Sequence, residues 1–399
     1  MKSYKLLFLA GAISIGSLMT SCKNDDDSSK TSSSSVKQNY AKMVAANYAD
    51  ALSSANDLKT AINAFTTTPN AQTHQAAKEA WITAREPYGL TEVYRFWAGP
   101  IDDDNGPEGA LNAWPLNENF IDYVYNPTTH TVENNGLIGD ATFNLTISSI
   151  VDQNESVDEK SISIGYHAIE FLLWGQDFNM APGTTTPDYS LSGQRSHTDF
   201  STDALAERRK TYLKLITDQL ITDLTYLVDA WKDNNAWGRK AFLAQSDDQA
   251  LTDMFNGMGK LAKGELAGER MFVALSNKDQ EDEHSCFSDN THRDIVQNYM
   301  GIKNVWEGTY GTINGSSIRD LIQEKNSVLA TTIDEKFTTT TELVNKINTQ
   351  KPFDELISSG NTAGNKVVMD ALVSLQELGD LLVESAASIG ITFVADLEE

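Results

Sequence analysis

The sequence is poor in positive charge, and this shortage excludes one class of partner. It contains 31 lysine and arginine residues against 56 aspartate and glutamate residues, for a formal net charge of −25. Binding to phosphates needs a basic face, so we expect no nucleic acid partner. An acidic surface keeps a protein soluble and can loosely concentrate cations.

Cysteine is nearly absent: the sequence contains only two, Cys22 and Cys286. Two thiols are too few for a zinc site built on cysteine. If Cys22 carries a lipid, Cys286 has no partner left for an intrachain disulfide. Several catalytic motifs are also missing: there is no HExxH zinc motif, no Walker loop and no GxSxG elbow.

The first 22 residues have the pattern of a secretion signal. Lys2 and Lys5 precede a mostly apolar run over residues 6–19, which is too short to span a bilayer. The run ends in Leu18-Met19-Thr20-Ser21-Cys22, which resembles the lipobox of bacterial lipoproteins. We therefore expect a signal peptide over residues 1–22 and a membrane attachment through acylated Cys22. An ordinary secretory signal with an incidental cysteine is the alternative.

An acidic and serine-rich segment follows over residues 23–36. It begins with Lys23-Asn24-Asp25-Asp26-Asp27 and cannot bury apolar surface, so we expect a flexible tether. An acidic run directly after a lipidated cysteine resembles the surface-export signal of Bacteroidetes-type lipoproteins. We therefore expect an outer membrane lipoprotein of the cell envelope, either periplasmic or exposed on the surface.

Proline is scarce in the second half, with none between Pro187 and Pro352, which leaves room for long helices. Over residues 204–232 apolar side chains recur every three or four positions, as on the buried face of a helix. Similar patterns predict helices over residues 37–66, 71–97, 160–175, 250–276, 318–347 and 363–388. Alternation typical of strands is rare, with at most a short hairpin at 142–147. The expected fold class is all-α, built from helical bundles.

A faint internal similarity predicts two such bundles. Gly165–Glu170 (GYHAIE) aligns with Gly264–Glu269 (GELAGE), where glycine, alanine and glutamate match and histidine is replaced by leucine. This fits a duplication, with one bundle over 37–203 and another over 204–399, although chance could also match so few positions. Residues 99–158, rich in proline, asparagine and glycine, would be a long irregular insertion in the first bundle.

His167 and Glu170 stand three positions apart on a predicted helix, so their side chains share one face. A neutral imidazole and a carboxylate at this spacing can bind one metal ion, provided that other segments complete the coordination. The alternative is a buried histidine–glutamate hydrogen bond without metal. The apolar residues 171–174 predict that this helix is buried. A charged side chain without a partner would be costly in free energy there.

Two other segments are rich in polar side chains that could complete the site. Residues 85–102 place several of them along one helical face, although a salt-bridge ladder on a solvated face would look the same. Residues 281–294 hold two histidines and five acids, although some of these could simply cap the next helix. The candidate ligand-binding residues are Arg85, Glu92, Asp102, Glu269, Glu283, His284, Asp289 and His292.

Together these segments resemble the imelysin family, also called imelysin-like or insulin-cleaving-membrane-protease-like proteins. Gly165-x-His167-x-x-Glu170 is similar to the family's GxHxxE motif, and the runs over 85–102 and 284–292 are similar to further family segments. The resemblance implies a pair of helical bundles with a polar site between them, in an iron-regulated envelope protein. It implies His167 and Glu170 as the centre of that site.

Two functions follow as hypotheses. The first is an iron-binding lipoprotein for uptake, in which His167 and Glu170 hold iron, or alternatively zinc, and deliver it to a permease or receptor. The second is a metal-dependent peptidase of the imelysin class with the same two residues at its catalytic centre. The absence of a standard protease motif favours binding. A purely structural surface lipoprotein is a third possibility.

Overall fold

The computed structural model describes residues 30–126, 131–133, 136–179 and 188–397. The predicted signal peptide, Cys22 and most of the predicted tether lie outside these residues. Helices dominate the described part, and the strands are two residues long each, so the all-α prediction is confirmed. Within the described residues, no helix is both long enough and apolar enough to cross a membrane.

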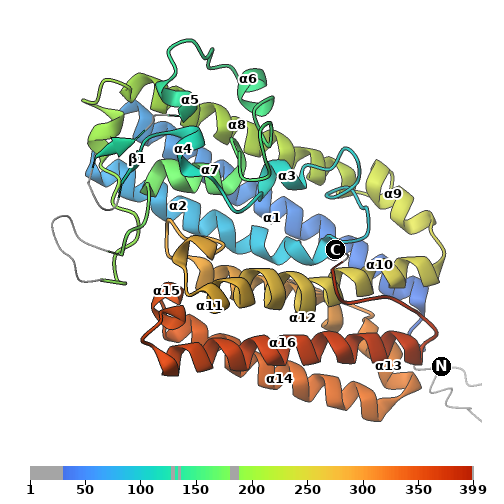
Figure 1. The fold of residues 1–399 in the computed structure, drawn as a ribbon. Helices are drawn as coiled ribbons and strands as arrows, with labels where there is room; N and C mark the ends of the chain where they lie inside the picture. Colours follow the sequence, from blue (N-terminus) through green and yellow to red (C-terminus); the bar gives the residue numbers. More distant parts are fainter. Residues whose placement is uncertain (1–29, 127–130, 134–135, 180–187, 398–399) are drawn as a thin grey trace, which may run out of the picture. The chain divides into compact units, whose positions relative to one another are not determined.

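The first group of helices is built around a hairpin of α1 (Ser33–Thr67) and α2 (Ala71–Gly89), on which α7 (Gly165–Trp174) and α8 (Ala206–Trp231) pack (Figure 1). We expected the tether to extend to residue 36, but α1 begins earlier. Ser32 caps it: its hydroxyl accepts a hydrogen bond from the Ser35 amide at 3.1 Å, and the Ser35 hydroxyl accepts one from the Ser32 amide at 3.2 Å.

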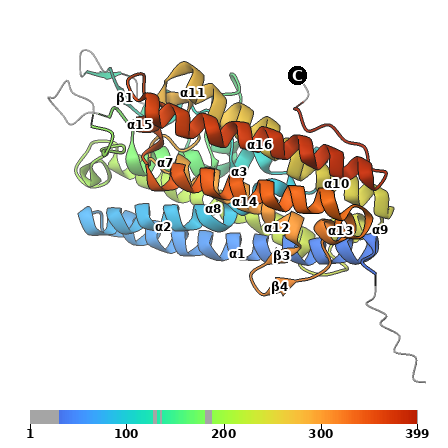
Figure 2. The ribbon, with the colours of Figure 1, turned by 90° about the horizontal axis from the view of Figure 1, so that it is seen from below.

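The second group of helices follows in the chain. Helix α10 (Asp247–Lys260) continues without a break into the π-helix η3 (Leu261–Val273) and then into α11 (Ala274–Asn277). Figure 2 shows α16 (Thr362–Ser388) beside α14 (Ser327–Thr349). Helix α12 (Thr291–Glu307) packs on α14 and η3, and it also contacts α2, so it joins the two groups.

Short elements complete the fold. The short helices are η1 (Leu90–Tyr94), α3 (Glu108–Leu111), α4 (Glu118–Ile121), α5 (Gly136–Gly139), α6 (Ile147–Val151), η2 (His197–Phe200), α9 (Trp237–Ala244), η4 (Gln280–Asp282), α13 (Ile318–Lys325) and α15 (Phe353–Ile357). Two antiparallel pairs are formed by β1 (Val124–Tyr125) with β2 (Val132–Glu133), and by β3 (Thr309–Tyr310) with β4 (Ile313–Asn314). The hairpin expected at 142–147 does not form, because Thr146 instead caps helix α6.

Helix α8 lies with the first group of helices. We expected a second bundle to start at residue 204, and α8 packs on α1 and α7. Its apolar stripe is buried there: Leu213, Ile216, Leu220 and Leu224 lie in the core. Residues 31–399 form one compact unit. The division into two bundles over 37–203 and 204–399, and their duplication, stay predictions.

Candidate functional site

His167 and Glu170 lie together on α7 and are almost completely buried, with exposed fractions of 1% and 0%. The Nδ1 atom of His167 is 2.9 Å from Oε2 of Glu170. The other carboxyl oxygen, Oε1, accepts hydrogen bonds from the amide of Ser288 at 3.0 Å and from its hydroxyl at 2.7 Å. The second ring nitrogen of His167, Nε2, is buried without a hydrogen-bond partner. Such atoms are rare in folded proteins, and a missing ligand is one of their explanations.

A second imidazole faces the first. The His284 ring meets the His167 ring edge-on, with centroids 4.7 Å apart. Its Nδ1 atom lies 2.7 Å from Oδ2 of Asp294, and its Nε2 atom lies 3.3 Å from the amide nitrogen of Asn112. Because an amide nitrogen can only donate, Nε2 of His284 accepts and its proton belongs on Nδ1. Both histidines thus turn Nδ1 toward a carboxyl group.

Arg85, on α2, holds the partners of His284 in place. Its Nε and Nη2 atoms donate to Oδ1 of Asp294 at 3.3 Å and 3.1 Å, and its Nη1 atom donates to the Asn112 side-chain oxygen at 2.6 Å. The guanidinium group also lies 5.1 Å from the ring centre of Tyr166. Arg85 is therefore part of a buried polar network, which excludes the alternative of a solvated salt-bridge ladder for this residue.

Glu92, on η1, extends the network toward the second group of helices. Its Oε2 atom accepts from Arg270 at 2.7 Å and from Arg95 at 2.8 Å, and Asn112 donates to its Oε1 atom at 3.4 Å. Arg270 also pairs with Glu265 at 2.8 Å. Hydrogen bonds thus connect His284 to the π-helix η3, and His167 joins this buried polar network through its ring contact with His284.

The π-helix decides which acid of this segment reaches the network. Glu265 and Arg270 are five positions apart, which is the hydrogen-bond spacing of a π-helix, and their side chains meet on one face. Glu269 is exposed and lies outside the network, although the internal alignment matched it to Glu170. The hydrophobic pattern predicted a helix here, but it did not distinguish π from α geometry.

The charges of the central residues follow from their burial. Burial lowers the pKa of His167 well below its usual range, with His284 and Arg85 adding to the effect. Burial likewise lowers the pKa of His284 to about 4. Burial raises the pKa of Glu170 to about 8, against the hydrogen bonds from Ser288. Near pH 7 both imidazoles are therefore neutral, which is the form that binds metal ions.

Besides Glu269, four of the predicted residues lie outside the buried polar network: Asp102, Glu283, Asp289 and His292. Glu283 is buried, and neither of its carboxylate oxygens has a hydrogen bond. The carboxylate of Asp102 accepts hydrogen bonds from the amides of Phe96, Trp97 and Gly99, so it closes a turn next to η1. His292 directs Nδ1 to the backbone oxygen of Asp289 at 2.9 Å. Neither side chain has a hydrogen bond into the buried polar network. Asp289 belongs to a separate group of acids.

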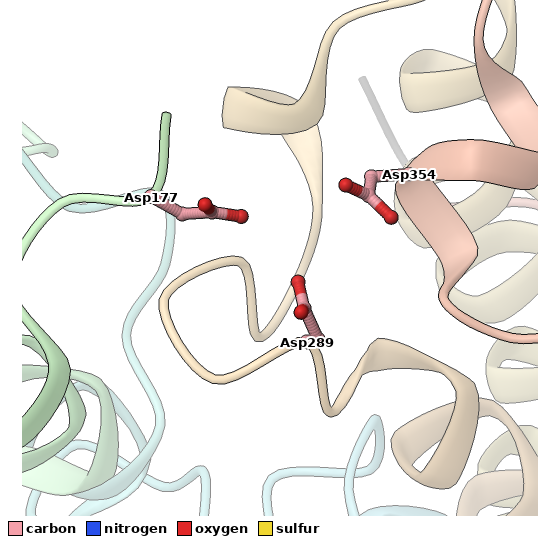
Figure 3. Close-up of side chains that lie close together, drawn as sticks. All are labelled: Asp177, Asp289 and Asp354. Atoms are coloured by element: carbon pink, nitrogen blue, oxygen red, sulfur yellow. The ribbon is translucent and has the colours of Figure 1, made fainter. Parts of the chain in front are cut away.

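This separate group is the acidic triad: Asp177 in the loop after α7, Asp289 in the loop before α12, and Asp354 on α15. Figure 3 shows their carboxylates pointing toward one another from three segments. Each offers an oxygen atom, and these atoms lie within 4.8 Å of one another. Among the described residues, no other three histidine, cysteine or acidic side chains bring their ligand atoms this close together. His167 and Glu170 therefore have no third side chain of these types within this distance.

A known family model matches most of the chain. Residues 44–382 match the family model described as imelysin. The chain belongs to the imelysin family. The chain is 23% identical over 350 residues to iron-regulated protein A of Synechococcus elongatus. The match covers 85% of this chain and 82% of that protein.

A solved structure shows the same fold. It is the crystal structure of a protein described as an iron-regulated protein A precursor, from Parabacteroides distasonis. Its TM-score is 0.67 at 20% sequence identity, and the match covers 90% of this chain and 97% of that chain. At this identity the likeness concerns the fold alone.

In this imelysin, five predicted residues meet in the buried polar network: Arg85, Glu92, His167, Glu170 and His284. Sequence analysis did not single out Asn112, Ser288, Asp294 or Arg270. Asp294 and Ser288 lie inside the polar run over 281–294, so that run contained a usable signal. No local sequence pattern marks Asn112 or Arg270. Only their contacts in the folded chain identify them as members of the buried polar network.

Glu92 is expected to make the protein sensitive to acid. Burial alone would raise its pKa, but Arg270, Arg95 and His284 lower it to about 2, from an ordinary value of 4.5. Because the folded-state pKa is the lower one, its contribution is complete above about pH 4.5 and is lost as the pH falls toward 2. The shift corresponds to about 3 kcal/mol.

We therefore predict that Glu92→Gln lowers the free energy of unfolding most at neutral pH. Urea unfolding of both proteins should show a difference that shrinks by roughly 3 kcal/mol as the pH is lowered from about 5 to 2. A difference that stays constant over this range would contradict the role given to Glu92.

Proposed function

We propose that this imelysin is an envelope lipoprotein that binds iron at the buried polar network and serves its uptake. The observation that carries the proposal is the Nε2 atom of His167, which is buried and unpartnered while Nδ1 is held by Glu170. A histidine that turns its other nitrogen to a carboxylate is the usual arrangement of a metal-binding imidazole. Nitrogen and oxygen donors without thiolates suit iron, with zinc as the alternative.

The residues present fit a reversible site better than a closed one. His167 would provide Nε2, while Glu170 orients its ring through Nδ1. His284, held by Asp294 in the same way, is a neighbouring imidazole whose Nε2 atom would have to exchange the hydrogen bond from Asn112 for the ion. Because these residues leave coordination positions open, water or groups bound to the incoming iron would fill them.

Two further lines support the proposal. The relatives from Synechococcus elongatus and Parabacteroides distasonis are both named for regulation by iron. The leader ending at Cys22 favours a lipid anchor at the cell envelope, in the outer membrane, where imported metals are first met. An iron-transport permease or a receptor would then be the partner that takes the ion onward.

Peptide cleavage is the second candidate, and one observation favours it. A carboxyl group with a pKa near 8 beside an imidazole is suited to general acid–base catalysis. However, neither His167 nor Glu170 is more than 1% exposed, so a peptide bond could reach them only after the site opens. Cleavage of unfolded protein that is sensitive to chelators and abolished by Glu170→Gln would establish this alternative.

We predict that the mature protein binds iron(II) under anaerobic conditions and that His167→Ala weakens this binding at least about tenfold. Isothermal titration calorimetry measures both. Glu170→Gln preserves the shape of the site but weakens its hold on His167, so we expect a loss of roughly 10–100-fold.

His74→Ala is the matched control for iron binding. His74 is also buried, and burial lowers its pKa to about 4, but it contacts the backbone oxygen of Leu173 and stacks on Phe65. Its loss should leave iron affinity unchanged. The proposal is refuted if neither iron(II) nor iron(III) gives binding heat, or if His167→Ala and Glu170→Gln both bind like the wild type.

A further inference from the structure

We propose that the acidic triad of Asp177, Asp289 and Asp354 is a second cation site, separate from the buried polar network, and that it takes calcium. The donors are carboxylate oxygens alone, which suit hard divalent cations. Neither the family match nor the two relatives assign a role to these residues.

The number of carboxylates in the acidic triad favours calcium among such cations. Each of the three offers an oxygen atom, and these atoms lie within 4.8 Å of one another. Calcium takes about 6–8 oxygen ligands in a flexible geometry, so several carboxylates from separate segments suit it. Magnesium demands a near-ideal octahedron and is usually bound through about one or two carboxylates, so it suits this group less well.

Glu283 is an independent sign that a cation belongs here. It lies outside the triad and is only 1% exposed, yet neither of its carboxylate oxygens has a hydrogen bond. Burial raises the pKa of Glu283 well above its usual range, and the nearby charges of Asp354, Asp289 and Asp177 add to the effect. The Thr291 hydroxyl lowers its pKa somewhat without reaching hydrogen-bonding geometry. A buried carboxylate without a partner is costly unless a cation compensates it.

The acidic triad itself also has free ligand atoms. The Oδ2 atom of Asp354 is buried without a hydrogen bond, and so is the side-chain oxygen of Asn179, two residues after Asp177. Amide and carboxylate oxygens are both calcium ligands.

A cavity gives a cation access to the acidic triad. Asp354 and Asn179 line a cavity of about 700 Å³, together with Glu118, Asp279 and Glu281. Its acidic lining would concentrate cations at the entrance. The triad is therefore buried enough to hold an ion firmly and close enough to solvent to be filled.

The acidic triad shares one loop with the buried polar network. Ser288, which donates two hydrogen bonds to Glu170, directly precedes Asp289 in the chain, and Glu283 directly precedes His284. A cation at the triad would fix the loop over 283–289 at both ends and so stabilise the contacts of Ser288. The proposal does not depend on iron binding and stands if the network binds no iron.

The alternative is that the carboxyl groups share protons and need no cation. Calcium titration of the mature chain after chelator treatment, at physiological salt, separates the two cases. We expect one site per chain by calorimetry and a rise in Tm on the order of 5 °C at saturating calcium. Asp354→Asn should abolish both effects. In chelator, however, Asp354→Asn should melt at or above the wild-type Tm, because one repelling charge is gone.

Glu355→Gln is the matched control for calcium binding. It removes an exposed charge from the neighbouring position and should keep the full calcium response. His167→Ala should also keep it, and Asp354→Asn should keep iron(II) binding. No calcium-dependent heat or Tm rise, an unchanged response in Asp354→Asn, or equal stabilisation by magnesium would overturn the assignment. Loss of the calcium response in His167→Ala would overturn the separation of the two sites.

Discussion

Asp294→Ala should destabilise the protein by about 3–5 kcal/mol, because it leaves a buried charge without its partner. Asp294 accepts hydrogen bonds from Arg85 at 3.1 Å, from His284 at 2.7 Å and from the Ser285 hydroxyl. Burial would raise its pKa, but Arg85 and His284 hold that pKa well below its usual range. Asp294 is therefore ionised at neutral pH.

The loss should exceed that of a surface ion pair by a wide margin. Without Asp294, the buried Arg85 guanidinium keeps only the oxygen of Asn112 as a hydrogen-bond acceptor. The control is Asp218→Ala, which breaks an exposed ion pair with Lys59 at 2.8 Å and should cost at most about 1 kcal/mol. Urea unfolding at pH 7 compares the two variants. Equal losses would show that the buried polar network does not stabilise the fold.

The helices could be predicted because their cause is local. In α8 the apolar residues Leu213, Ile216, Leu220 and Leu224 recur at helical spacing, and all of them are buried. The partner of that buried face is not encoded locally. The sequence could therefore predict α8 as a helix, but not that it would pack on α1 instead of on the helices that follow it.

The candidate site divides in the same way. His167 and Glu170 could be paired from the sequence because three positions on a helix bring side chains together. Arg85 also looked like part of a helical ladder, but its main partner, Asp294, comes from a helix far along the chain. Whether a charged helix face is solvated or buried depends on such distant partners, which the spacing does not show.

The acidic triad could not be predicted at all. Asp177, Asp289 and Asp354 come from three segments separated by long stretches of chain, and each looks locally like a loop or capping residue. Asp289 was predicted, but as a ligand near His284. The structure instead turns its carboxylate toward Asp177, while Ser288 before it turns to Glu170. Adjacent residues thus serve two different clusters.

Gly165→Ala should be the second large destabilisation, and its cause explains the glycine of the GxHxxE motif. Gly165 has a φ of +90°, a conformation that side chains disfavour. A Cβ atom there would lie 2.7 Å from the backbone oxygen of Ala110 and 2.8 Å from that of Leu111. Backbone strain and the clash together should cost roughly 2–5 kcal/mol.

The clash also has a consequence for the site. Ala110 and Leu111 immediately precede Asn112, which orients Arg85 and His284, so a Cβ atom at position 165 would push this loop away from both. Gly390→Ala separates strain from clash, because Gly390 has a φ of +86° and no atom would lie within 4 Å of its Cβ. That control should lose only about 1–2 kcal/mol in urea unfolding. If Gly165→Ala loses no more, the close approach of α7 to the Asn112 loop is not what requires glycine there.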